Sequence, residues 1–86
     1  MNSKELKKRK KDVEVLLSEF GFIDPDRDIL QLKAIFDVED KDINVSGIFE
    51  KGGKVYEVHY KDVVISLVIR NYEFKIVNIV EYDDMI

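Results

Sequence analysis

The sequence contains no cysteine, no threonine and no tryptophan, and it has only one histidine, one proline and one alanine. Without cysteine the chain forms no disulfide bond and offers no thiolate to a metal ion, which fits a reducing compartment. Nor is there an apolar run long enough to cross a bilayer or to act as a signal peptide. We therefore expect a cytoplasmic protein.

Length and charge point to one small acidic domain. Eighty-six residues are enough for a single core, so we predict one α+β domain over residues 1–86. Residues 1–11 hold six basic side chains and one acidic one, a net +5, whereas residues 12–86 hold eight basic and seventeen acidic ones, a net −9. The acidic body disfavours nonspecific nucleic-acid binding. The scarcity of alanine beside abundant Ile, Val, Lys and Asp is typical of low-GC bacterial or phage genes.

The N-terminal residues predict an amphipathic helix from about 3 to 20. Asn2 and Glu5 have the spacing of a capping box, and Gly21 stands where a helix commonly ends in a left-handed residue. Apolar residues between them recur at helical spacing and form one stripe: Leu6, Val13, Leu16, Leu17 and Phe20. Lysines lie on the opposite side: Lys4, Lys7, Lys8 and Lys11.

Three short polar turns predict an antiparallel meander with strands at about 43–50, 54–60, 63–69 and 72–80. The turns are Gly52-Gly53, Lys61-Asp62 and Arg70-Asn71. They imply these cross-strand neighbours: Phe49 with Tyr56, Val45 with Tyr60, Tyr60 with Val63, Val58 with Ile65, and Ile69 with Tyr72. All these residues share one face, which the helix is expected to cover.

Residues 29–38 fit two structures. Asp24-Pro25 is a good helix start, but the apolar residues from Leu30 to Val38 alternate as in a strand. We prefer a fifth strand. The predicted fold is thus an N-terminal amphipathic helix packed on one face of a four- to five-stranded antiparallel meander sheet.

The second face of this sheet carries the candidate binding site. In the predicted register one row is partly apolar and surrounds the only histidine; together with a neighbouring isoleucine it comprises Ile35, His59, Val64, Val77 and Ile79. Because the first face is covered by the helix, we predict that these residues bind a protein partner, together with the acidic rim at residues 37–42.

Signals for catalysis and for metal binding are weak. Ser46 is expected opposite His59, but no carboxylate or glycine-rich oxyanion loop accompanies them. Asp24, Asp26 and Asp28 resemble the start of a calcium loop, yet the glycine and glutamate that such a loop requires are missing. We predict no catalytic residues, no metal and no cofactor.

The sequence therefore favours a non-enzymatic protein-interaction module, an adaptor, regulator or inhibitor that bacteria or phages could encode. One alternative is nucleic-acid binding through the basic helix, which would weaken steeply with salt. Another is a homo-oligomer formed through the second sheet face or a sheet edge.

Overall fold

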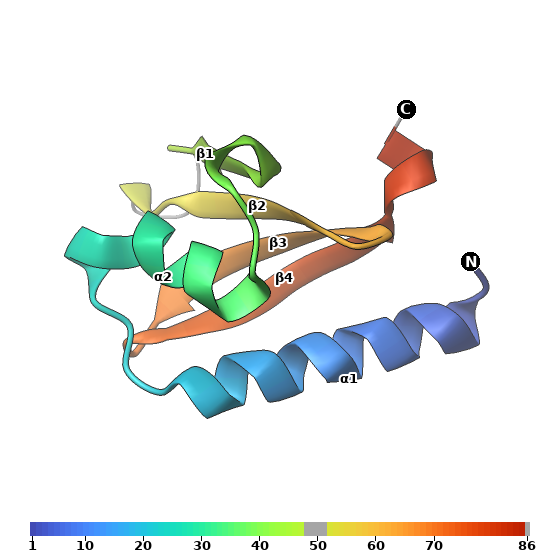
Figure 1. Cartoon of the computed structure of the whole chain (residues 1–86), viewed down its shortest axis with the longest axis horizontal. Coiled ribbons are helices and arrows are strands. Elements are labelled where there is room, and N and C mark those ends of the chain that lie inside the picture. Colours follow the sequence, from blue (N-terminus) through green and yellow to red (C-terminus); the bar gives the residue numbers. More distant parts are fainter. Residues whose placement is uncertain (48–51, 86) are drawn as a thin grey trace.

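The computed structural model describes residues 1–47 and 52–85. Two α-helices, α1 (Ser3–Phe20) and α2 (Asp28–Phe36), pack with a four-stranded antiparallel sheet (Figure 1). The strands are β1 (Ile43–Ser46), β2 (Val55–Tyr60), β3 (Val63–Arg70) and β4 (Glu73–Glu81), and they lie in sequence order. Short 3-10 helices are η1 (Pro25–Arg27), η2 (Asp40–Asp42) and η4 (Tyr82–Met85). The predicted α+β meander is confirmed.

Helix α1 begins and ends where the sequence predicts. The side chain of Asn2 accepts a hydrogen bond from the backbone N–H of Glu5 at 2.9 Å, which satisfies a donor that the first turn leaves without a helical partner. Gly21 follows the last turn with φ of 86°, a value that glycine adopts without steric strain. Val13 is fully buried at the centre of the apolar stripe.

The preferred fifth strand is wrong, because residues 28–36 form α2. Asp28, Leu32 and Phe36 are buried and lie four residues apart, so they share one side of the helix, whereas Leu30 is 64% exposed. A strand would place Leu30 and Leu32 on the same face. The left-handed Asp37, with φ of 53°, ends the helix. The helical alternative is therefore correct for this segment, although Asp24-Pro25 starts the short helix η1 and α2 follows from Asp28.

The strand register agrees with the prediction at one of three pairings. Across β2 and β3, Val58 lies opposite Ile65 and Tyr60 opposite Val63, as predicted. Between β1 and β2 the predicted register is wrong by four residues, since Val45 lies opposite Tyr56. The predicted partner of Tyr56, Phe49, lies outside the described residues.

The β3–β4 hairpin also differs from the prediction. Its turn residues are Asn71 and Tyr72 rather than Arg70 and Asn71, and Ile69 lies opposite Phe74. Both turn residues have positive φ, 52° and 63°, as in the type I′ turn that matches strand twist.

A β-bulge shifts the far half of this hairpin once more. Leu67 lies opposite Ile76 but Ser66 lies opposite Asn78, so Val77 is the extra residue. Beyond the bulge, Ile79 lies opposite Ile65 and therefore on the core face. Counting alternate residues from the turn cannot reveal such a change of face.

Both helices cover the same face of the sheet. The buried cluster takes residues from α1, the loop after it, α2 and three strands: Val13, Ile23, Leu32, Phe36, Tyr56, Val58, Val63, Ile65, Leu67 and Phe74. Helix α1 runs along β4 in the opposite direction, and α2 lies near the start of β2 (Figure 1). Within the described residues, neither helix combines the length and apolarity that spanning a bilayer would require.

Candidate protein-interaction surfaces

The five residues predicted to form one binding patch are divided between the two sides of the sheet. Ile35 belongs to α2, and it packs partly buried against the core, as does Ile79. His59 and Val64 are opposite each other on the second face, where Val64 is only 9% exposed. Val77 is 51% exposed at the bulge. The single row expected from the sequence is therefore not assembled, and a binding role for these side chains stays a prediction.

An aromatic side chain from the end of the chain covers His59. The ring of Tyr82 in η4 stacks on the imidazole with centroids 4.1 Å apart and planes inclined by 7°. The backbone N–H of Tyr82 donates to the carbonyl of Asp62 at 2.9 Å, which fixes η4 against the β2–β3 turn. This contact is not predictable from the sequence, because no local pattern shows that residues after β4 return to the second face.

The pairing of Ser46 with His59, considered as a catalytic arrangement, does not form. Ser46 lies opposite Val55, and His59 lies beyond the four residues of β2 that pair with β1. Acidic side chains near residue 40 cap the short helix η2: the carboxylates of Glu39 and Asp42 each accept a hydrogen bond from the backbone N–H of the other residue, as in a capping box. In residues 1–47 and 52–85 no group of His, Asp and Glu is arranged to hold a metal ion.

Asp28 is the buried charged group of the described chain, at 8% exposure. It accepts hydrogen bonds from the Tyr56 hydroxyl at 2.5 Å, from the Ile29 N–H at 2.7 Å and from Lys54 Nζ at 3.3 Å. Burial alone would raise the pKa of Asp28, but these three donors outweigh it and the pKa is lowered. Burial and the Asp28 carboxylate raise the pKa of Tyr56. These hydrogen bonds tie the start of α2 to β2 and so support the position of the helix on the sheet.

The basic side of α1 contributes one structural contact. Arg9 donates to both carboxylate oxygens of Asp62, at 2.9 and 3.2 Å, and so ties the helix to the β2–β3 turn. This pair raises the pKa of Arg9 and lowers that of Asp62. Lysines on the same helix are exposed: Lys4, Lys7, Lys8, Lys10 and Lys11.

Two aromatic rings are held in solvent at one end of the molecule. Phe22, in the loop after α1, is 67% exposed, and Tyr72, in the β3–β4 turn, is 56% exposed. The rings stack with centroids 4.7 Å apart and an interplanar angle of 17°. The N–H of Ile23 donates to the carbonyl of Tyr72 at 2.8 Å, which holds the two segments together. We call Phe22 and Tyr72 the aromatic pair.

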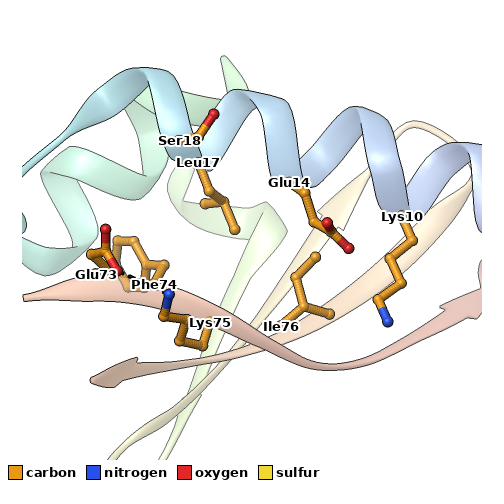
Figure 2. A pocket seen from close by; sticks show the side chains of 8 residues that line it. All are labelled: Lys10, Glu14, Leu17, Ser18, Glu73, Phe74, Lys75 and Ile76. Carbon is orange, nitrogen blue, oxygen red and sulfur yellow. Dashed lines mark ion pairs between the residues drawn. The ribbon is translucent and has the colours of Figure 1, made fainter. Parts of the chain in front are cut away.

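A groove follows β4 on the side of α1 (Figure 2). Its larger part has a volume of about 370 Å³, and its lining residues come from both elements: Lys10, Glu14, Leu17 and Ser18 of α1, and Glu73, Phe74, Lys75 and Ile76 of β4. A second part of about 220 Å³ shares Lys10 and continues along the helix to Ser3, Leu6, Lys7 and Ile79. Both parts together are called the α1–β4 groove.

The chain was also compared with known proteins. No protein-family model, no curated protein and no solved structure matches it. Its function must therefore be argued from its own residues.

Proposed function

We propose that this chain is a non-enzymatic protein-interaction module. The observation that supports the proposal is the aromatic pair, and above all Tyr72. A type I′ hairpin turn that begins with Asn71 is normally completed by glycine, since both central residues need positive φ. A tyrosine in this conformation costs about 1–2 kcal/mol of backbone strain, and its ring is more than half exposed.

A strained and exposed tyrosine at this position lowers both stability and solubility, which suggests that the ring has a role in binding. The stack on Phe22 fixes the orientation of both rings before any encounter. Rigid, exposed aromatic side chains are the typical anchors of protein interfaces, because they bury much area and lose little conformational freedom on binding. The aromatic pair thus has the physical properties of an anchor for a partner protein.

The substitution Tyr72→Gly tests this function. It converts the turn to Asn-Gly, so relief of backbone strain offsets the lost stack, worth about 0.5–1.5 kcal/mol. We expect thermal stability equal to or above that of the wild type, together with loss of the proteins that the wild-type chain captures from native-host cells. The control is Val15→Ser, which removes a 47% exposed apolar side chain from α1, outside the aromatic pair.

The outcome also separates the alternatives. If the Tyr72→Gly chain captured the same proteins as the wild type, the aromatic pair would not be an anchor and the proposal would fail. Retardation of nucleic acid that disappears with added salt would favour the basic helix instead. A concentration-dependent mass in light scattering would favour a homo-oligomer.

A further inference from the structure

We propose that the α1–β4 groove binds an extended segment of a partner protein. The segment adds to the sheet beside β4, carries apolar side chains at alternate positions, and has acidic residues at the end that lies beside Lys7 and Lys10. This inference rests on the proposed function and names a ligand class for it. The groove starts at Glu73, directly after the aromatic pair's Tyr72, so the two surfaces adjoin.

The backbone of β4 explains why the ligand is an extended chain. β4 is the last strand in the sheet order, so among the described residues it has a strand neighbour on one side only. The two-residue turn makes Arg70 and Glu73 the closing pair of the hairpin ladder. Since hydrogen-bonded and non-hydrogen-bonded pairs alternate in an antiparallel ladder, the N–H and C=O groups of Phe74 and Ile76 point away from β3. An added strand can pair with these groups.

The side chains along the groove explain why alternate ligand positions are apolar. Phe74, Ile76 and Ile79 lie on the face of β4 that α1 covers, and Leu6 and Leu17 approach from the helix. In Figure 2 the Leu17 side chain points from the helix toward β4. Every second side chain of an added strand would point to this same face, at a spacing of about 6.6 Å. These side chains would fill the space between the helix and the strand.

The charges along the groove determine at which end of the ligand acidic residues are favoured. Near the hairpin, Glu73 is neutralised by Lys75, whose Nζ lies 2.9 Å from its carboxylate. Midway along the groove Glu14 adds one negative charge. Toward the N-terminus of α1 the charged lining residues are Lys7 and Lys10, so this end of the groove is positive. An acidic residue of the ligand at this end would be attracted, whereas a basic one would be repelled.

The bulge at Val77 makes a second copy of this chain a poorer occupant. It ends the regular ladder of β4 after Ile76, and two β4 strands paired along their length would each meet the irregularity of the other. A foreign segment needs regular pairing only with residues 73–76 and can then continue beside Ile79.

Selection from a phage-displayed library of short random peptides on the full-length chain tests the proposal. We expect enrichment of sequences with alternating apolar residues and Asp or Glu at one end. Fluorescence polarisation then measures the affinity of the best peptide after N-methylation of each amide in turn. Methylation should abolish binding at every second position, where the amide faces β4, and be tolerated between them.

Charge reversal on the helix provides the matched variants. Lys7→Glu combined with Lys10→Glu should weaken the peptide about tenfold or more, and should favour a version of it with lysines in place of the acidic residues. Lys4→Glu combined with Lys11→Glu changes the net charge equally on residues that do not line the groove. This control should leave the affinity unchanged.

Four results would overturn the inference: no enriched peptide, an N-methylation profile without a two-residue period, equal effects of the two charge-reversal pairs, or a β4-mediated dimer in sedimentation. The proposed function has its own readout. If the groove fails these tests while Tyr72→Gly still loses the captured proteins, the chain is an interaction module that does not bind through the groove.

Discussion

Removal of a single oxygen atom tests how α2 is held to the sheet. Tyr56→Phe deletes the hydroxyl that donates to Asp28, and it leaves the ring against Phe74, where the centroids are 5.5 Å apart. Tyr56 is 2% exposed and Asp28 8%, so water cannot readily replace the lost donor. A hydrogen bond to a charged group contributes about 1.5–3 kcal/mol, and for a domain of this size 2 kcal/mol corresponds to a fall of about 8–16 °C in Tm.

Urea unfolding followed by circular dichroism measures the free energy directly. Tyr60→Phe is the matched control, since Tyr60 stands on the same strand and packs its ring on Phe36, and within the described chain its hydroxyl makes no hydrogen bond. A double-mutant cycle of Tyr56→Phe with Asp28→Asn should give a coupling of at least about 1 kcal/mol. A coupling below about 0.5 kcal/mol, or an equal loss in Tyr60→Phe, would refute the reasoning.

The same cluster predicts how stability depends on pH. The folded pKa of Asp28 lies below its ordinary value of 3.8, so its contribution is complete above that value and is lost as pH falls through the folded pKa. The folded pKa of Tyr56 lies above its ordinary value of 10.0, so its contribution is complete below that value and declines as pH rises beyond it. The gap between wild type and Tyr56→Phe should therefore be largest near neutral pH and narrow at both extremes.

Three further substitutions address other parts of the structure. Leu67→Asp places a charge at a fully buried position, which costs several kcal/mol, and cooperative melting of this variant would contradict the assigned core. Val64→Lys should lower Tm clearly because Val64 is 9% exposed, whereas Val77→Glu at 51% exposure should change stability by less than about 0.5 kcal/mol; equal melting curves would contradict these positions. Arg9→Gln removes the ion pair to Asp62 and should lower Tm in low salt, with a difference that fades as salt is added; a salt-independent difference would argue against the pair.

Features set by neighbouring residues were predictable from the sequence. The cap at Asn2 and the glycine at position 21 define the two ends of α1, and the apolar stripe between them defines its buried side. The Lys61-Asp62 turn is equally local, and it gave the correct β2–β3 register. A helix with other ends would have left a backbone donor without its cap, and a hairpin with a shifted register would have exposed its apolar residues.

Features set by tertiary contacts were not predictable. The alternation from Leu30 to Val38 suits a strand as well as a helix, and the contact that favours the helix, between Asp28 and Tyr56, joins residues that are distant in sequence. The exposed tyrosine at position 72 occupies a turn position that propensity assigns to glycine, so the turn was placed one residue early. The bulge at Val77 then moved Ile79 from the predicted binding face to the core.

The candidate surfaces depend on the same tertiary contacts. Neither the aromatic pair nor the groove follows from a motif, because each joins the first quarter of the chain to the β3–β4 hairpin. Of the predicted patch, only His59 and Val64 remain adjacent on the second face.

The packing of α1 on β4 affects the order in which the chain can fold during synthesis. Each strand pairs with the next one, so the sheet can grow hairpin by hairpin as the polypeptide emerges. Helix α1 is translated before all four strands of the sheet, yet the strand along which it packs is β4, the last of the four. Its apolar stripe therefore stays incompletely covered on the ribosome until β4 has been made, which makes the nascent chain a candidate substrate for chaperones during that interval.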